Sequence, residues 1–116
     1  DFEELGTAGT AAMALDLAWK GCDAVYLSFD IDSIDPGYAP GTGTPEPGGF
    51  TPREALEMVR IIAKEGLCAM EVVEVSPPYD VNDSTSQLAC RVILDTLGTM
   101  VTEGKLGHRD KVMRPE

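Results

Sequence analysis

Two aspartates that lie two residues apart, Asp30 and Asp32, have the type and spacing that best fit metal chemistry in this sequence. They stand at the carboxyl end of an apolar, β-prone run, VYLSFDI (residues 25–31). Because strand side chains alternate between two faces, both carboxylates are expected to project from one face. Neighbouring buried carboxylates repel one another unless a cation or a proton neutralises them. The pattern predicts a divalent metal site, and its alternative is a carboxylate pair that caps a turn.

The stretch after the aspartates, residues 33–50, is rich in proline and glycine. Four prolines and five glycines exclude a helix or a central strand, and long loops in compact domains usually carry function. Ligands of parallel α/β sheets bind beyond the carboxyl ends of the strands, which is where this loop begins. Within it, Asp35 precedes Pro36, so we expect its carboxylate to accept a backbone N–H and fix the bend.

A second apolar run, residues 67–75, carries two glutamates. Glu74 lies near its carboxyl end, where α/β sheets place ligands, and is a second candidate for the same site. Alternation puts Glu71 on the opposite face, where we expect it to face a helix or to form a buried salt bridge. A buried salt bridge is also the alternative for Glu74.

The elements that must position these acids alternate between helix and strand. The Thr51-Pro52-Arg53-Glu54 sequence is typical of a helix start with a capping box, and Ser84 with Gln87 is expected to cap the last helix. The order α-β-α-β-α with apolar strands predicts an α/β fold, a parallel sheet covered by helices. The expected elements are a helix over 1–21, a strand over 24–31, a helix from Thr51 to Gly66, a strand over 67–75, a helix from Ser84 to Gly104, and a flexible tail over 105–116.

Composition limits the partners of the chain. A net charge of −11 argues against nucleic acid and anionic membranes, and it suits a cationic ligand, although a solvated acidic surface accounts for most of it. No stretch approaches the roughly 18 apolar residues that span a bilayer, and the acidic start argues against a signal peptide. Cys22, Cys68 and Cys90 show no disulfide or CxxC pattern, so we expect reduced core cysteines in a cytoplasmic protein.

The run from Ser28 to Gly49 resembles the C-terminal metal signature of the ureohydrolases, the arginase and agmatinase family of dimanganese enzymes. The segment TGTPEPGG (residues 42–49) is closer to the agmatinase-like branch, and VVEVSPP (residues 72–78) also resembles the family. Since the similarity runs from about residue 24 to about residue 97, residues 1–116 are expected to be the C-terminal part of a single three-layer α-β-α domain with an arginase-like parallel sheet.

The resemblance also implies roles for four residues. Asp30 would bridge two manganese ions, and Asp32 would bind one of them. Glu74 would pair with the substrate guanidinium. Thr44 would orient that glutamate or, as an equal alternative, stabilise the loop through its hydroxyl. Nickel or another divalent ion could replace manganese.

The implied reaction is hydrolysis of a guanidino compound to urea and an amine. Agmatine, which gives putrescine, is the leading substrate, and guanidinobutyrate, guanidinopropionate, guanidine and proclavaminate-like compounds are the alternatives. The resemblance further implies a cytoplasmic homo-oligomer, a trimer or a hexamer.

The metal-binding histidines and aspartates of the N-terminal half of that family, and its proton-shuttling histidine, have no match here. His108 is the only histidine, and it is expected to be solvated in the tail. The chain alone is therefore expected to be inactive. Two other classes remain: a catalytically incomplete homologue, against which the retained acids argue, and a Mg²⁺-dependent phosphoryl-transfer module, against which the lack of a basic residue in TGTPEPGG argues.

Overall fold

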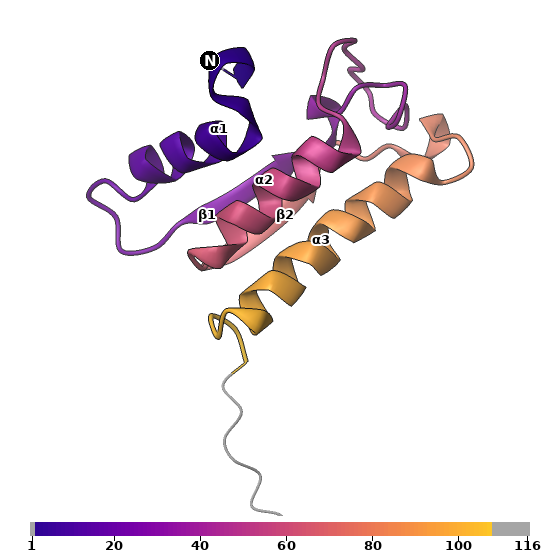
Figure 1. The fold of residues 1–116 in the computed structure, drawn as a ribbon. Coiled ribbons are helices and arrows are strands. Elements are labelled where there is room, and N and C mark those ends of the chain that lie inside the picture. Colours follow the sequence, from indigo (N-terminus) through magenta and orange to yellow (C-terminus); the bar gives the residue numbers. More distant parts are fainter. Residues whose placement is uncertain (1, 108–116) are drawn as a thin grey trace, which may run out of the picture.

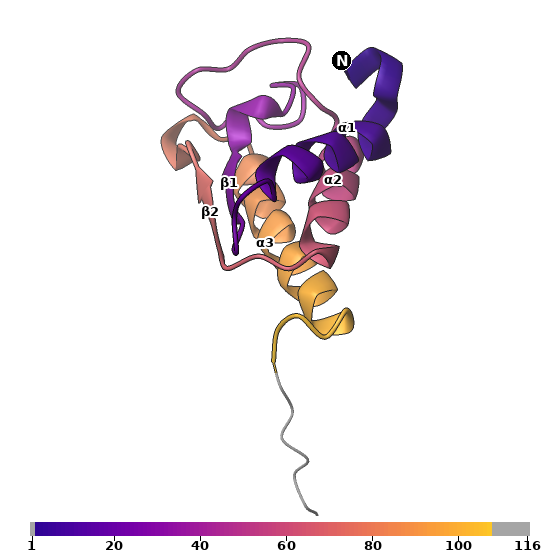
Figure 2. The ribbon, with the colours of Figure 1, turned by 90° about the vertical axis from the view of Figure 1, so that its left-hand side faces the viewer.

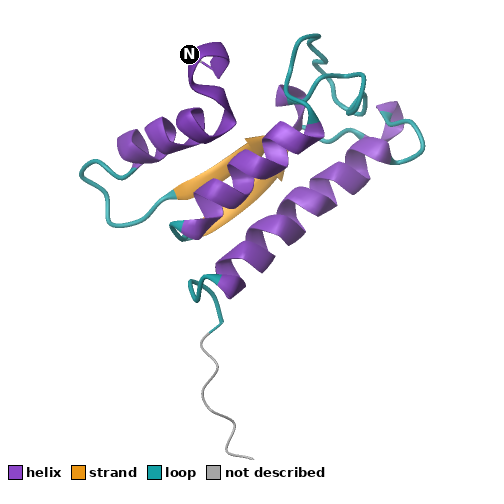
Figure 3. Cartoon of the chain, in the orientation of Figure 1, coloured by secondary structure: helices purple, strands orange, loops and turns teal. Residues whose placement is uncertain are grey.

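The structure, a computed structural model, describes residues 2–107. The order of elements confirms the predicted α-β-α-β-α arrangement and the α/β class (Figure 1 and Figure 3). His108 and the rest of the predicted tail lie outside the described residues, whereas the N–H groups of Lys105 and Leu106 bond back to the Met100 carbonyl. The helices and strands are α1 (Phe2–Ala18), β1 (Tyr26–Asp30), α2 (Pro52–Lys64), β2 (Ala69–Val73) and α3 (Ser84–Thr102).

The two strands form a parallel sheet, in a register that pairs Tyr26 with Ala69 and Asp30 with Val73. Parallel neighbours need a crossover, and α2 supplies it. Figure 2 shows α2 and α3 on the same side of the sheet. The face opposite these helices is open in the described chain, and Tyr26 is half exposed on it.

The hydrophobic core lies between this sheet, α2, α3 and the first part of the loop after β1. Ile31 and Ile34 come from the loop, which is therefore part of the core rather than an appendage. Because α2 and α3 hold the inner sheet face in this way, the carboxyl ends of both strands are fixed relative to one another. The buried members are Phe29, Ile31, Ile34, Ala39, Ala55, Val59, Ala89 and Val92.

The sequence patterns predicted the start of α2 correctly and the extent of α1 only in part. At α2 the predicted capping box is confirmed: the Thr51 hydroxyl accepts from the Glu54 N–H at 3.3 Å, and the Thr51 N–H donates to the Glu54 carboxylate at 2.8 Å. The predicted helix over 1–21 is interrupted at Gly6, whose φ of 65° places it in the left-handed region, and it ends at Ala18.

The predicted Ser84–Gln87 cap of α3 is wrong. Asp83 occupies the cap position in a left-handed conformation and makes no side-chain cap bond. Asp80 replaces it, because the turn Pro77–Tyr79 carries its carboxylate back to the first turn of the helix. There it accepts from the N–H groups of Thr85 at 3.0 Å and Ser86 at 2.9 Å.

Two predictions about buried residues are also wrong. Cys22, Cys68 and Cys90 are free but exposed, because they lie in the turn after α1, just before β2 and on the outer side of α3. Glu71 is exposed on the open sheet face, where it accepts a hydrogen bond from the Ser28 hydroxyl at 2.9 Å instead of forming a buried salt bridge. Among residues 2–107, no helix combines the length and apolar character that a membrane crossing requires.

Candidate metal centre

Asp30 is the last residue of β1, and the chain leaves the sheet directly after it in a tight turn over Ile31–Ser33. The Asp30 carboxylate accepts from the Asp32 N–H at 3.1 Å, and the Asp30 carbonyl accepts from the Ser33 hydroxyl at 2.7 Å. Asp32 therefore lies beyond the strand. The turn, and not strand alternation as predicted, brings the two aspartates together.

The electrostatics of Asp30 show that three acids share this edge. Burial of the Asp30 carboxyl raises its pKa, and the negative charges of Asp32 and Glu74 raise it further, against the opposing effect of the Asp32 N–H. Since an added positive charge would relieve this repulsion, the arrangement favours a cation.

Glu74 reaches this edge through an unusual backbone conformation. In the register Asp30 pairs with Val73, so strict alternation would turn the next residue toward the helix-covered face. β2 ends at Val73, however, and Glu74 has a φ of 64°. A left-handed conformation is uncommon for a residue with a side chain, and here it interrupts the alternation at the point where the Glu74 charge acts on Asp30.

Thr44 lies in the loop and contacts a different acid from the one predicted. Its hydroxyl donates to the Asp32 carboxylate at 2.7 Å, whereas the resemblance implied a role beside Glu74. Both Thr44 and Glu74 are exposed, so this edge faces solvent. The observed bond orients the carboxylate oxygen of one predicted metal ligand.

Asp35 closes the loop, as predicted. Its two carboxylate oxygens accept from the N–H groups of Gly48 and Gly37, each at 2.8 Å, and these bonds lower its pKa. At the loop end, the Phe50 N–H donates to the Ser33 carbonyl at 2.9 Å. Gly49 is needed there, since a Cβ would lie 2.6 Å from the Ser33 carbonyl oxygen.

A second closure of the loop was missed from the sequence. The Gly41 N–H donates to the Thr85 hydroxyl at 2.8 Å, and the Gly41 carbonyl accepts from the Ser76 N–H at 2.7 Å. A Cβ at Gly41 would lie 2.8 Å from the Cβ of Asp80. Because Gly41 and Thr85 are 44 residues apart, no local pattern could have indicated this contact.

The carboxylates at this edge are of the right type to bind a divalent metal, but there are too few of them. Carboxylate oxygens suit Mn²⁺ and similar ions. Within residues 2–107, however, no group of three or more His, Cys, Asp or Glu side chains is arranged to hold one. Asp30 and Asp32 are thus two predicted ligands, and a complete metal site would need further ligands from elsewhere.

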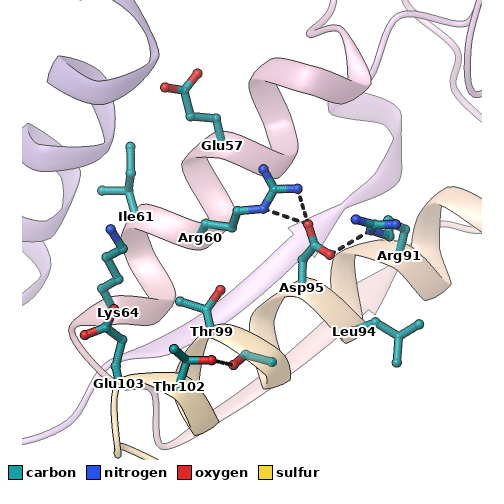
Figure 4. A pocket seen from close by; sticks show the side chains of 11 residues that line it. Glu57, Arg60, Ile61, Lys64, Arg91, Leu94, Asp95, Thr99, Thr102 and Glu103 are labelled. Carbon is teal, nitrogen blue, oxygen red and sulfur yellow. Dashed lines mark hydrogen bonds and ion pairs between the residues drawn. The ribbon is translucent and has the colours of Figure 1, made fainter.

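A cavity of about 590 Å³ is separate from these acids. It lies between α2 and α3, and only residues of these helices and Glu103 line it (Figure 4). Arg60 from α2 and Arg91 from α3 both bond to the Asp95 carboxylate, the latter at 2.7 Å. This cluster joins the two helices and offers no side chain to the candidate site.

Comparison with known proteins gives consistent matches. The family model described as "Arginase family" matches residues 1–98. A guanidinobutyrase from Pseudomonas aeruginosa is 51% identical over 77 residues, which are 66% of this chain and 24% of that protein. An agmatinase from Proteus mirabilis is 49% identical over 73 residues, 63% of this chain and again 24% of that protein. The chain thus spans about a quarter of the length of these relatives.

The fold is also similar to solved structures. A formimidoylglutamase from Bacillus subtilis superposes with a TM-score of 0.82 at 34% sequence identity, covering 87% of this chain and 32% of that one. The predicted arginase-like α/β fold class is thereby confirmed.

Proposed function

The chain belongs to the arginase family, and on that premise we propose that the complete protein hydrolyses a guanidino compound to urea and an amine. The observation that carries the proposal is the convergence of Asp30, Asp32 and Glu74 at one edge of the sheet. Their negative charge attracts cations: Asp30 and Asp32 offer oxygens to a divalent metal, and Glu74 offers a carboxylate partner to a guanidinium group.

Asp30 and Asp32 would hold the metal, with Asp30 as the bridging ligand and further ligands from residues outside this chain. We propose two manganese ions, which when bound supply a water activated for attack near neutral pH. The Thr44 hydroxyl keeps the Asp32 carboxylate in one orientation, and Asp35 holds the loop closed around this end of the strand.

Glu74 would bind the substrate. A guanidinium is planar and presents forked N–H donors, which pair best with a carboxylate. The Glu74 backbone is left-handed, and its charge acts on Asp30, so a guanidinium held by Glu74 would lie on the same edge as the predicted metal ligands.

Agmatine is the substrate we propose first, because residues 42–49 are closest to the agmatinase-like branch and an agmatinase is among the relatives. Guanidinobutyrate is the second candidate, since a guanidinobutyrase is 51% identical. From the same family membership we propose a cytoplasmic homo-oligomer, a trimer or a hexamer, which sedimentation analysis of the complete protein would test.

The test is urea release by the complete protein with Mn²⁺ and, in parallel, agmatine, guanidinobutyrate and guanidinopropionate. Glu74→Gln should lower kcat/KM by about 100-fold or more, because the guanidinium loses its charged partner. The matched control is Glu71→Gln, which changes a glutamate three residues earlier, in β2 on the open face, and should stay within about twofold. No urea from any of these compounds would contradict the proposal.

Metal content gives a second test. In the complete protein Asp30→Ala should lose more metal than Asp32→Ala, because a bridging carboxylate serves two ions and a terminal one serves a single ion. Elemental analysis after gel filtration measures the metal bound per protomer. Full and equal occupancy in both variants would count against the bridging role.

A further inference from the structure

The peptide unit at Gly41 is held from both sides by residues that come much later in the chain. Its carbonyl accepts from the Ser76 N–H at 2.7 Å, and its N–H donates to the Thr85 hydroxyl at 2.8 Å. The Thr85 N–H in turn donates to the Asp80 carboxylate at 3.0 Å, and that carboxylate also accepts from the Ser86 N–H at 2.9 Å in the first turn of α3. Gly41, Thr85 and Asp80 form a continuous hydrogen-bonded series, which we call the loop clamp.

The loop clamp joins the two halves of the candidate site. On one side, Gly41 precedes Thr44 by three residues, and Thr44 binds Asp32. On the other side, Ser76 follows Glu74 by two residues. Figure 1 shows the loop after β1 and the start of α3 at the same end of the molecule. A displacement of Gly41 would therefore move Glu74 relative to the loop that frames the metal ligands.

Thr85 is built for this contact. Its side chain is completely buried, and its hydroxyl accepts the hydrogen bond from the Gly41 N–H. No side chain could replace the hydrogen at Gly41, because Asp80 occupies that space. The contact between Gly41 and Asp80 thus limits how closely the loop approaches α3, and the hydrogen bond from Gly41 to Thr85 holds the two together.

We propose that Thr85 is a positioning residue of the substrate site, which through Gly41 and Ser76 sets the place of the Glu74 carboxylate relative to Asp30 and Asp32. This inference rests on the proposed function, since Glu74 is taken as the guanidinium partner. Thr85 itself touches neither substrate nor metal.

Thr96 provides a matched control on the same helix. It is also completely buried, but its hydroxyl donates to the Val92 carbonyl one turn earlier in α3. Thr85→Val and Thr96→Val make the same change in shape and polarity, and only the first removes a bond to the loop. Thr85→Ser keeps the hydroxyl and serves as the rescue variant.

The kinetic test uses the complete protein with agmatine and Mn²⁺. Thr85→Val should lower kcat/KM at least about tenfold, mainly through KM, because displacement of a binding group by a fraction of an ångström weakens orientation. Metal content should stay at the wild-type level, since Asp30 and Asp32 remain on their own turn. Thr85→Ser and Thr96→Val should both stay within about threefold of wild type. Equal kinetic losses in Thr85→Val and Thr96→Val would overturn the proposal, as would a loss that serine does not rescue.

A measurement without turnover separates this proposal from the proposed function. Hydrogen–deuterium exchange of the peptide that contains Gly41 should lose protection in Thr85→Val and keep it in Thr96→Val and Thr85→Ser. If the wild type releases no urea while this pattern holds, the guanidino hydrolase proposal fails and the clamp remains. If protection at Gly41 is the same in all variants, the clamp is wrong whatever the activity.

Discussion

In the loop over residues 31–50 and in the helix α3, regular structure and burial do not go together. The loop has little regular structure, yet Ile31, Ile34 and Ala39 in it are at most 1% exposed. α3 is a regular helix of 19 residues, yet Leu94 and Val101 on it are 65% and 58% exposed.

The difference lies in where each region finds its partners. A helix pairs most of its backbone groups internally, so it forms without burying all of its sides. A loop has no such regular ladder, and this one combines bonds to its own Asp35 side chain and Ser33 carbonyl with a bond to Thr85 in α3. Contacts within this chain thus satisfy the hydrogen bonds of the loop, whereas one apolar stripe of α3 stays exposed to solvent. The stripe consists of Cys90, Leu94, Leu97 and Val101.

The largest effect is expected when the chain of residues 1–116 is compared with the complete protein. Residues 1–116 contain the whole loop but only two predicted metal ligands, and several ligands per ion are needed to hold two metals together. Urea release from agmatine with Mn²⁺ should therefore be undetectable for residues 1–116 and substantial for the complete protein. Manganese-dependent turnover by the short chain would show that its site is self-contained.

Two glycine substitutions compare the regions directly by chemical unfolding of the complete protein. Gly49→Ala should destabilise the protein by about 3 kcal/mol, because the new Cβ would meet fixed backbone atoms and force the loop to move. Gly98→Ala in α3 has no atom within 4 Å of its Cβ, and it should stabilise the helix by about 0.5–1 kcal/mol. Equal effects of the two changes would mean that the loop is not tightly packed.

The exposed stripe on α3 should control association of residues 1–116. Leu94→Glu places a charge within the stripe and should shift the chain toward monomer in sedimentation experiments, because contiguous apolar surface drives association. Gln87→Glu adds the same charge at an exposed polar position of the same helix and should leave association unchanged. A similar shift in both variants would assign association to net charge instead of the stripe.

The smallest expected effect concerns pH and salt. Burial alone would raise the pKa of Asp80, but hydrogen bonds from Ser86 and Thr85 outweigh it and hold the pKa far below the usual range. Burial likewise acts against the lowered pKa of Asp95, which Arg60 and Arg91 stabilise in its charged form. A depressed folded-state pKa stabilises the protein above the unfolded value of about 4, and that stabilisation is lost as the pH falls below it.

The melting temperature of Asp80→Asn in the complete protein should therefore fall less than that of wild type between pH 6 and about pH 3. High salt should reduce the effect of Asp95→Asn, since the ion pairs with Arg60 and Arg91 are partly exposed and screened. It should leave the effect of Asp80→Asn unchanged, because backbone N–H groups at short range supply that stabilisation. An Asp80→Asn variant with the pH dependence of wild type would contradict the cap assignment.

Features that depend on neighbouring residues followed from the sequence alone. The capping box of Thr51 and Glu54 and the turn at Asp35 were predicted because their partners lie within the same short segment. The alternation of apolar strands with helices predicted the parallel α/β fold, and the spacing within residues 28–49 predicted the family.

The tertiary structure alone decided which of these segments meet. Strand alternation predicted that Asp32 shares a strand face with Asp30, whereas a turn after the strand brings the two residues together. The cap of α3 comes from Asp80 instead of the predicted Ser84. Glu74 acts on Asp30 from a left-handed backbone conformation of its own, which no pattern of residue types indicates. The contact of Gly41 with Thr85 spans 44 residues. Such contacts depend on the register of the sheet and the packing of α3 against it, which arise only when the whole chain has folded.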